Sequence, residues 1–520
     1  MKNNIGLLLA KRAELNPDRE AYIDVASGLR LTFSELNIRC NRLANALVTS
    51  GVKQGDRVAL LMMNSPEFMA AYFAVAKIGG IVVPLNWRLV ADELEFMLND
   101  SGSTTMIFGE EFIDLVTDLY ARGDKTDLHQ WIQLSNTNGE TSFSKDYRMF
   151  EQGGAESEPQ VSAAADDLLY IMYTSGTTGL PKGVVHTHST TLWAILTFTI
   201  TCDYRDGDRN LAALPMFHVG ALIPLIINVY RGMTSIVMRE FDPQKAWELM
   251  QDEKITHALF VPAMLNFMLQ VPNSDRFDVS ALRFILSGAS PLPVSLIQAY
   301  SDIDIEVQQI YGLTESCGPA AVINGENALK KIGSTGRPFF HTEVRIVDAK
   351  GNDCLPGEQG EVWVSGLHVM KEYWNNPEAT KETIVEGRWL RTGDIASMDE
   401  AGFIYILDRI KDMIISGGEN VYPAEIENVI LEHPDVEDVA VIGQPSERWG
   451  ESPFAVIVKK EDSLSEADVL KFCDGKLARF KLPKGAVFID LIPRNPSGKV
   501  LKRLLREDFP GPSERMDSAT

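Results

Sequence analysis

The sequence predicts an α/β plus α+β protein with a large N-terminal domain of helix-covered, mostly parallel sheets and a small C-terminal α+β domain. Three observations support this class. Apolar runs alternate with helical stretches over the first part of the chain, short strands and turns replace them beyond about Thr342, and a compact pattern of its own begins near residue 414. The 520 residues are enough for two or more hydrophobic cores.

The first part of the chain repeats a strand–helix–strand order. The stretch from Arg57 to Asn86, RVALLMMNSPEFMAAYFAVAKIGGIVVPLN, has an apolar run, a turn at Pro66, a helical stretch and a second apolar run. This order is typical of a βαβ unit, whose two strands are parallel. ITHALFVP followed by AMLNFMLQV, and LRFILSGASPLP followed by VSLIQAYS, predict further units of the same kind.

The later part of the chain has a different pattern, which predicts short strands in place of βαβ units. The segments TEVRIVDAKGND, GEVWVSG and GFIYILDR indicate short strands in an antiparallel or barrel-like arrangement. After DRIKDMIISGGEN we expect a helix from about Pro423, strands VAVIG and PFAVIVKK, a helix SEADVLKFCDGKLA and a strand AVFID. These elements have the size of a separate small domain, and the final GPSERMDSAT is typical of a frayed tail.

Composition and charge exclude several classes of function. The formal charge of -23 argues against a nucleic-acid partner, because phosphate backbones are bound by a basic face. Cys40, Cys202, Cys317, Cys354 and Cys473 are too far apart for a zinc knuckle or a redox pair, and they favour a reducing, cytoplasmic location.

No secretion signal and no transmembrane segment are expected. The N-terminus lacks a charged start followed by an apolar signal core. The uncharged runs 184–202 and 210–230 contain His, Thr, Asn and Pro residues and are interpreted as buried core elements. Peripheral membrane contact and a homodimer stay open.

The segment YTSGTTGLPKG, from Tyr173 to Gly183, has the composition of a phosphate-binding loop. Its glycines allow close backbone approach, and it offers several hydroxyls and one lysine, Lys182. The Walker A order is broken, because Lys182 is followed by Gly183 and Val184 where that motif has a hydroxyl residue. A Ser/Thr/Gly surface loop is the alternative, but the lysine and the apolar LLYIMY before the loop favour phosphate binding.

Five further segments carry side chains suited to nucleotide and acid chemistry. QIYGLTES joins an aromatic ring to a hydroxyl and a carboxylate, WLRTGD ends in a carboxylate, and DRIKDMIISGGENVYPAEIE and PRNPSGK bring cations. PMFHVGAL places His218 in an apolar segment, where a lone histidine is more often a core residue than a catalyst. Each segment alone has such a structural explanation, but their joint presence in this order is a strong signal.

These segments identify the chain as resembling the adenylate-forming superfamily, which holds acyl-CoA synthetases, luciferase and peptide-synthetase adenylation domains. The resemblance runs from LTFSELN at Leu31 to NPSGKVLKRLLRE near the C-terminus. Within the superfamily the chain most resembles the fatty acyl-CoA ligases, with feruloyl and other aryl-CoA ligases as near neighbours.

The resemblance implies a two-step reaction that uses ATP, Mg²⁺ and coenzyme A. A carboxylic acid would attack the α-phosphorus of ATP, release pyrophosphate and form acyl-AMP, and the thiol of CoA would then expel AMP. The implied catalytic residues are Lys499, Glu315, Thr314, Lys182 and His218, with Thr174 and Glu315 near the metal. The implied ATP-binding residues are Thr174, Ser175, Gly176, Thr177, Thr178, Gly179, Lys182, Gly288, Ala289, Gln309, Tyr311, Gly312, Thr314, Glu315, Asp394, Ile406, Arg409 and Lys499. Among these, the resemblance implies that Gly288, Ala289, Gln309 and Tyr311 frame adenine, that Ile406 touches its face, and that Asp394 and Arg409 hold the ribose.

The same resemblance implies a domain boundary and a hinge. It divides the chain into residues 1–408, a hinge at 409–413 centred on Lys411, and a mobile small domain at 414–520. Rotation of the small domain would withdraw Lys499 after the first step and bring a glycine pair to the CoA channel. The implied CoA-binding residues are Arg88, Gly417, Gly418, Trp449 and Phe480, although Leu482 stands where an aryl-CoA relative has arginine.

The implied acyl pocket is apolar. It is formed by His218, Val219, Leu222, Ile310, Gly312, Cys317 and Gly318. A pocket without a charged side chain disfavours a second carboxylate on the substrate. Three residues depart from the family: Ile310 replaces a glycine, Leu222 replaces a tryptophan gate of one long-chain relative, and Glu372 replaces a common glycine.

The expected function is therefore ligation of CoA to a monocarboxylic acid, with a medium- or long-chain fatty acid favoured. An aryl acid, or transfer of the acyl group to a separate carrier protein, are the alternatives within adenylation. A nucleotide-binding regulator with a silent site is disfavoured, because Lys182, Glu315, Asp394 and Lys499 are all present.

Overall fold

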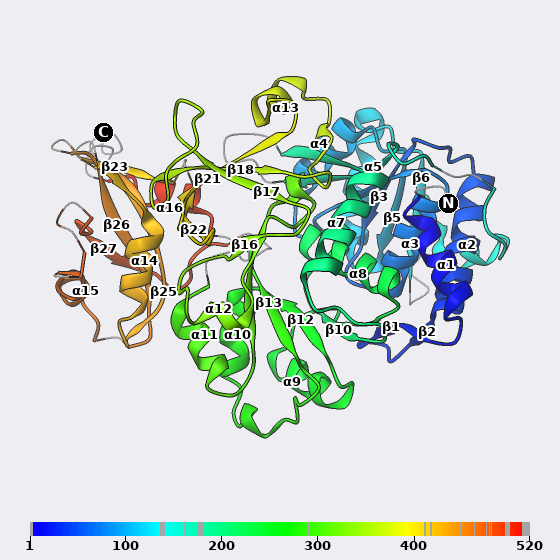
Figure 1. Ribbon diagram of the computed structural model, residues 1–520. Helices are drawn as coiled ribbons and strands as arrows, with labels where there is room; N and C mark the ends of the chain where they lie inside the picture. The colour runs from blue at the N-terminus through cyan, green and yellow to red at the C-terminus, as the bar shows by residue number, and fades with distance from the viewer. Residues whose placement is uncertain are drawn as a thin grey trace.

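The computed structural model consists of a large part and a smaller C-terminal part at one side of it (Figure 1). It describes residues 4–135, 141–160, 163–174, 181–289, 292–409, 412–416, 419–446, 449–461, 463–474, 476–477, 479, 481–494 and 500–511. Within these residues the strands form four sheets, of which three belong to the large part.

The first sheet contains the expected βαβ unit. Strand β3 is parallel to both of its neighbours, β4 and β5, and the helix between β3 and β4 begins at Pro66 with the Ser65 hydroxyl accepting a hydrogen bond from the Phe68 amide. In order across the sheet its strands are β19 (Glu372–Tyr373), β9 (Lys182–Thr187), β8 (Leu168–Thr174), β4 (Ile81–Pro84), β3 (Arg57–Leu61), β5 (Thr105–Gly109), β6 (Gln130–Leu134) and β7 (Lys145–Asp146). At one edge β8, β9 and β19 pair in antiparallel fashion.

The second sheet is parallel from β1 to β14, with short antiparallel strands at both ends. In order its strands are β16 (Arg337–Pro338), β15 (Ala321–Val322), β14 (Val307–Tyr311), β13 (Phe284–Ser287), β12 (His257–Phe260), β10 (Arg209–Ala212), β11 (Thr234–Val237), β1 (Glu20–Asp24) and β2 (Arg30–Thr32).

The two sheets and their helices form five layers, and Figure 1 shows the central helices beside the strands. The central helices are α1 (Gly6–Leu15), α2 (Phe33–Thr49), α3 (Pro66–Lys77), α7 (His188–Thr201) and α8 (Val219–Arg231). The outer helices are α4 (Ala91–Ser101) and α5 (Ile113–Ala121) on the first sheet, and α9 (Pro243–Asp252), α10 (Pro262–Leu269) and α11 (Val294–Ser301) on the second. Helix α3 is buried on nearly every side, because it packs between α1, α2 and the sheet.

The segment after Thr342 forms the expected antiparallel structure. Its strands are β17 (Glu343–Val347), β18 (Gln359–Ser365), β21 (Trp389–Met398) and β20 (Ile384–Val385), and β22 (Ile404–Arg409) also pairs with β21. Within the described residues these strands make an open sheet with no closing pair. Short helices α6 (Tyr147–Gln152), α12 (Gly325–Ala328) and α13 (Pro377–Thr383) complete the large part.

The C-terminal part has a sheet of its own. Its strands are β24 (Glu419–Val421), β23 (Ile414–Ser416), β26 (Gly450–Lys459) and β25 (Val436–Ser446), with β27 (Ala486–Phe488) beside β26. Its helices are α14 (Pro423–Leu431), α15 (Glu466–Cys473) and α16 (Lys502–Asp508). The helix expected over SEADVLKFCDGKLA is shorter than predicted, because Asp474 leaves it in an extended conformation with ψ 131°.

The predicted fold class is confirmed by this architecture. The uncharged run 184–202 contains the central helix α7, and the run 210–230 contains the central helix α8 up to its last residue, Arg231. Among the described residues, none of the helices combines the length and the apolar character that a membrane crossing requires.

Candidate active site

The predicted phosphate loop connects two antiparallel strands. Strand β8 ends at Thr174 and β9 begins at Lys182, and these two residues are cross-strand partners. The Thr174 hydroxyl donates to the Lys182 carbonyl oxygen at 3.4 Å. The loop between them, with Ser175, Gly176, Thr177, Thr178 and Gly179, lies outside the described residues. A hairpin differs from the strand–loop–helix of Walker A, as the broken motif predicted.

The carboxyl edge of the second sheet carries the next group of predicted residues. Gly288 and Ala289 follow β13, and Gly312, Thr314 and Glu315 follow β14. Residues beyond the carboxyl ends of parallel strands form the usual binding crevice of an α/β sheet. Sheet topology therefore brings residues from separate segments to one edge.

Three distant groups fix the loop that bears Glu315. His186 donates from Nε2 to the Thr314 carbonyl at 2.8 Å, and His368 donates from Nδ1 to the Ser316 carbonyl at 2.8 Å. The Met370 amide donates to the Glu315 carbonyl at 2.7 Å. Burial lowers the pKa of both imidazoles to about 4, so each is neutral near pH 7 with its proton on the nitrogen that faces a carbonyl.

Tyr373 contacts the two predicted phosphate-side charges. Its hydroxyl donates to Glu315 Oε1 at 2.8 Å, and the Lys182 Nζ lies 4.9 Å from the centre of its ring. Glu315 and Lys182 are therefore joined through one aromatic side chain.

The predicted ribose-binding carboxylate, Asp394, is already bonded to two side chains. It is 5% exposed, accepts a hydrogen bond from the Tyr311 hydroxyl at 2.6 Å on Oδ2, and pairs through Oδ1 with Arg409 Nε at 3.0 Å. The residues belong to three strands, β14, β21 and β22, of which the last two pair directly. A ribose held here would meet a carboxylate whose orientation is fixed in advance.

The predicted adenine side depends on close backbone contacts. A β-carbon on Gly288 would lie 2.6 Å from the Ile310 carbonyl oxygen, and one on Gly312 would lie 1.5 Å from the Gly318 carbonyl oxygen. Only glycine fits at these two positions. Ala289 has φ 72°, an uncommon conformation for a residue with a side chain, and it stands next to residues 290 and 291, which the structure does not describe.

The remaining predicted ATP contacts lie on the same sheets. Gln309 is buried on β14, and Ile406 is partly buried on β22, where it pairs with Ala396.

The predicted acyl side is apolar apart from one histidine. Val219 and Leu222 lie in the first turn of α8, and His218 precedes them. The imidazole Nε2 of His218 is closed off from solvent and has no hydrogen-bond partner among the described residues. Burial and nearby Arg88 lower the pKa of His218 to about 4, so the ring is neutral near pH 7.

Cys317 and Gly318 complete the predicted pocket. Cys317 is fully buried, has φ 57°, and its Sγ lies 3.1 Å from the Tyr170 hydroxyl. Burial raises the pKa of this thiol to about 12, so it is protonated and a poor nucleophile. Gly318 faces the ring of Phe198 from α7.

The predicted CoA-binding residues lie on both parts of the molecule. The Arg88 guanidinium lies 4.3 Å above the Trp87 ring in the large part, and Trp449 is 40% exposed in the turn between β25 and β26. Gly417, Gly418 and Phe480, together with Lys411 and Lys499, fall outside the described residues.

Polar contacts join the two parts near the expected hinge. The Ala424 amide donates to Asp408 Oδ2 at 3.1 Å, and the Tyr422 hydroxyl donates to Gln359 Oε1 at 2.7 Å. Burial raises the pKa of Asp408.

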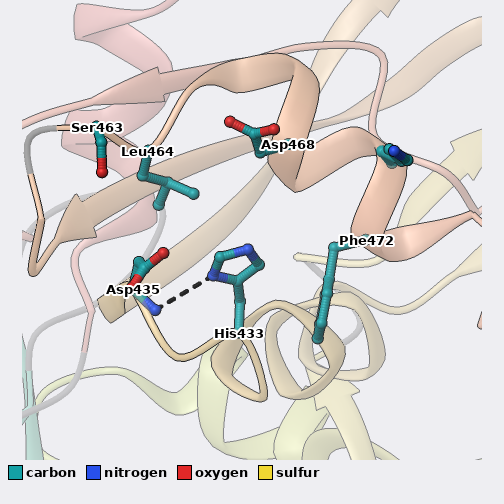
Figure 2. Close-up of a pocket in the computed structure, with 7 residues that line it drawn as sticks. His433, Asp435, Ser463, Leu464, Asp468 and Phe472 are labelled. Atoms are coloured by element: carbon teal, nitrogen blue, oxygen red, sulfur yellow. Dashed lines mark hydrogen bonds between the residues drawn. The ribbon is translucent and has the colours of Figure 1, made fainter.

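A hollow of 560 Å³ in the C-terminal part is separate from these residues. Figure 2 shows His433 near Phe472 and the hydrogen bond from the Asp435 amide to His433 Nδ1. The lining residues are His433, Asp435, Ser463, Leu464, Asp468, Lys471 and Phe472. No residue that the sequence singled out for chemistry lines it, so we do not assign it to the reaction.

Sequence reasoning missed several side chains at the site. His186, His368 and Tyr373 do not belong to the nucleotide motifs, and their contacts with the Glu315 loop arise from residues 52 to 128 positions away. The segment MKEYW, which follows His368, carries one signal, because its buried-type aromatic residue Tyr373 stands directly beside the family departure Glu372.

Comparison with known proteins agrees with the motifs and the fold. The family model described as AMP-binding enzyme matches residues 9–374, and the model described as AMP-binding enzyme C-terminal domain matches residues 425–499.

Curated relatives match over nearly the whole chain. The long-chain-fatty-acid–CoA ligase FadD13 of Mycobacterium tuberculosis is 45% identical over 97% of this chain and 98% of its own length. A feruloyl-CoA synthase of Amycolatopsis is 38% identical over 98% of this chain and 100% of its own. The fatty acid–[acyl-carrier-protein] ligase ScoC of Streptomyces coeruleorubidus is 38% identical over 94% of each chain.

Solved structures give the same picture. A Mycobacterium tuberculosis fatty acyl CoA synthetase is 44% identical, with a TM-score of 0.79 over 98% of both chains. ATP-bound MatB from Rhodopseudomonas palustris is 31% identical, with a TM-score of 0.89 over 98% of this chain and 99% of its own. An N-terminal domain of FACL13 from Mycobacterium tuberculosis is 41% identical, with a TM-score of 0.74 over 79% of this chain and 100% of its own.

The motifs, the two-part α/β architecture and these matches lead to one conclusion. The chain belongs to the family of AMP-binding enzymes.

Proposed function

We propose that this protein is an ATP-dependent, AMP-forming acid–CoA ligase whose substrate is a medium- or long-chain fatty acid. The observation that carries the proposal is the joining of distant residues at one site. Lys182 lies over the ring of Tyr373, and Glu315 accepts a hydrogen bond from the Tyr373 hydroxyl. Glu315 follows strand β14, and Tyr311 at the end of that strand belongs to the Tyr311–Asp394–Arg409 group. An acid-activating site needs this combination of cations, a metal-binding carboxylate and a ribose-binding carboxylate.

The first step would form acyl-AMP. A carboxylate is a weak nucleophile that must approach an anionic phosphate, so the site has to offset charge on both reactants. We assign this task to Lys182 and to Lys499, whose position lies outside the described residues. One carboxylate oxygen of the acid bonds to the α-phosphorus, and the bond to the bridging oxygen of pyrophosphate breaks with its electron pair.

The donor set suits Mg²⁺ held mainly by substrate. The described residues contain no cluster of three or more His, Cys, Asp or Glu side chains that could hold a metal alone. Magnesium is usually bound by one or two carboxylates together with phosphate oxygens and water, and Glu315 with the Thr174 hydroxyl fits that chemistry. When bound, the ion would neutralise part of the phosphate charge.

The second step would transfer the acyl group to CoA. The CoA thiol attacks the acyl carbonyl and AMP leaves, so no protein thiol is needed. This agrees with Cys317, whose buried thiol stays protonated. Arg88, Trp449, Gly417, Gly418 and Phe480 remain our proposed contacts for CoA.

We propose that the small domain rotates between the steps. The proposed units are residues 1–408, a hinge at 409–413 with Lys411, and residues 414–520. A relative whose N-terminal domain was solved alone covers 79% of this chain, nearly the share that residues 1–408 make up, and this supports the boundary. Rotation would exchange Lys499 for the segment around Gly417 and Gly418.

The described pocket residues favour an uncharged acyl chain. Val219, Leu222, Ile310 and Cys317 offer no charge, and His218 is neutral near pH 7. A second carboxylate would be costly to bury there. The name of FadD13 as a long-chain fatty acid ligase supports the same class, and the feruloyl-CoA synthase keeps an aryl acid as the alternative.

The acyl acceptor has one alternative. ScoC is named as a ligase that loads an acyl-carrier protein, so transfer to a carrier in trans is the second candidate.

The five cysteines are free thiols, which supports placing the reaction in the reducing cytoplasm.

The proposal is tested by measuring pyrophosphate and AMP release with short, medium, long and aryl acids, with and without CoA. We expect pyrophosphate release to depend on a fatty acid, and sustained AMP release with thioester formation to depend on CoA. If AMP release depends on a carrier protein and is independent of CoA, the carrier protein is favoured as the acyl acceptor. If none of the acids causes pyrophosphate release, the proposal is wrong.

A further inference from the structure

We propose that Tyr373 is a positioning residue of the phosphate site, which orients Glu315 and keeps Lys182 apart from it until Mg²⁺ and ATP bind. This inference rests on the proposed function and adds a residue that neither the motifs nor the comparisons single out.

One side chain makes both contacts from a buried position. Tyr373 is 7% exposed, its hydroxyl donates to Glu315 Oε1 at 2.8 Å, and Lys182 Nζ lies 4.9 Å from its ring centre. The ammonium of Lys182 thus contacts the ring of Tyr373, and the carboxylate of Glu315 contacts its hydroxyl. The ring face, which is negative, holds the ammonium, while the hydroxyl edge holds the carboxylate.

The backbone of the same segment contacts both neighbours. Tyr373 pairs with Val184 in the β19–β9 ladder, and the Trp374 amide donates to the Gly183 carbonyl at 2.7 Å. The Met370 amide donates to the Glu315 carbonyl at 2.7 Å. Residues 370–374 thus connect the strand that begins at Lys182 with the loop that bears Glu315, and the Tyr373 ring has little freedom to move.

The hydroxyl is a dependable donor. A phenol keeps its proton at physiological pH, because its ordinary pKa is about 10. A hydrogen bond to one carboxylate oxygen leaves the other oxygen of Glu315 for a hydrated metal ion.

The ring prevents a competing ion pair. A lysine and a glutamate in direct contact neutralise one another, and ATP would then have to break that pair before binding. A cation over an aromatic face at a partly exposed position is held weakly, so Lys182 can move to a phosphate at low cost.

The neighbouring Glu372 has a different environment. Successive side chains of a strand point to opposite faces, so Glu372 is directed away from the face on which Tyr373 meets Glu315. The departure from the family at residue 372 therefore lies outside this arrangement.

The first test replaces the hydroxyl alone. Tyr373→Phe keeps the ring over Lys182 and removes the donor to Glu315. We expect the Mg²⁺ concentration for half-maximal stabilisation of the ATP complex against heat to rise about tenfold, because Glu315 loses its fixed orientation. The maximal rate of acid-dependent pyrophosphate release at saturating Mg²⁺ and ATP should change by less than about threefold.

The second test removes the ring. Tyr373→Leu should weaken Mg²⁺-free ATP binding, measured by equilibrium dialysis in EDTA, by about threefold, because Lys182 then pairs with Glu315. Adding Glu315→Gln to Tyr373→Leu should restore Mg²⁺-free ATP binding. A general loss of structure would not be repaired by removing the negative charge of Glu315.

Tyr405→Phe is the matched control. The Tyr405 hydroxyl also donates to a carboxylate, Asp399, at 3.5 Å, but on a part of the large domain outside the predicted site. Tyr405→Phe should leave both Mg²⁺ binding and ATP binding unchanged. Thermal melting without ligand checks that every variant is folded.

The outcomes separate this inference from the proposed function. The role of Tyr373 is wrong if Tyr373→Phe shows the wild-type Mg²⁺ dependence, or if Glu315→Gln does not restore ATP binding to Tyr373→Leu. In either case the wild-type enzyme would still make acyl-AMP, and the proposed function would stand. A wild-type protein that is not stabilised by ATP and releases no pyrophosphate contradicts the proposed function itself.

Discussion

On the proposed ribose side of the candidate site, the Asp394 carboxylate is bonded to both a phenol and a guanidinium. On the proposed acyl side, the imidazole Nε2 of His218 has no hydrogen-bond partner among the described residues. The first side is fixed by directional contacts of 2.6 and 3.0 Å between Asp394 and its two partners. The second is bounded by apolar packing around Leu222 and Cys317.

This difference concerns how each side tolerates change. Directional charge contacts depend on identity, because removing one partner leaves the other buried without compensation. Apolar packing depends mainly on volume, so a substitution changes the shape of the space and the preferred ligand. We therefore expect nucleotide-side variants to lose activity and acyl-side variants to change selectivity.

The largest effect is expected from Lys499→Ala. Loss of this cation should slow acyl-AMP formation on the order of 10²-fold or more, because charge in the transition state is no longer offset. Thioester formation from supplied acyl-AMP and CoA should be largely spared. Single-turnover measurement of each half-reaction checks this, with exposed Lys484→Ala as the control. Equal losses in both half-reactions contradict the proposed division of labour.

Asp394→Asn should have the next largest effect. The neutral amide no longer compensates Arg409, which lies 3.0 Å away. We expect kcat/KM for ATP to fall on the order of 10²-fold, about 3 kcal/mol, with the acid preference unchanged.

The control for Asp394→Asn is Asp353→Asn, whose carboxylate pairs with Arg345 but is 66% exposed. Exposed pairs contribute little, so this variant should keep wild-type kinetics. An altered acid preference in Asp394→Asn would mean that the two sides of the site are not independent.

His218 should contribute to the pH dependence of the free energy of unfolding. Its pKa in the folded protein is about 4, below the ordinary value of 6.5, because burial disfavours the charged ring. The unfolded chain therefore binds the proton first, and the stability present above pH 6.5 is lost as the pH falls toward 4. In His218→Asn, the decrease in the free energy of unfolding between pH 7 and pH 5 should be smaller by about 2 kcal/mol.

Urea titrations at the two pH values measure this decrease. Exposed His129→Asn is the matched control and should show the wild-type decrease. If His218→Asn also shows it, then His218 has the same pKa in the folded protein as in the unfolded chain, and burial does not keep its ring neutral at pH 5.

The smallest effect is expected from Ile310→Gly. Ile310 packs against Gly288, where its Cγ2 would lie 2.8 Å from an added β-carbon. Opening this wall should shift the ratio of kcat/KM between two acids of different chain length or shape by about tenfold, while the KM for ATP is kept. Competition between paired acids measures the ratio. An unchanged ratio removes Ile310 from the pocket.

Particular elements explain which predictions succeeded. The helix at Pro423 was predicted correctly at its start, because proline favours the first turn of a helix. The βαβ units and the family were confirmed, since both depend on local pattern and contiguous motifs. The helix over residues 465–478 was predicted too long, because Asp474 leaves it in an extended conformation directly before Gly475, a weak helix former. The predicted roles of the site residues stay predictions.

The sequence by itself determined the α/β class, the family and the residue types available for adenylation, because hydrophobic periodicity and short motifs are properties of neighbouring residues. Only the tertiary structure decided that Tyr373 joins Glu315 to Lys182, and that His186 and His368 hold the Glu315 loop. These contacts bridge strands and loops far apart in the chain. Sheet pairing and burial set such distances, and a linear pattern does not encode them.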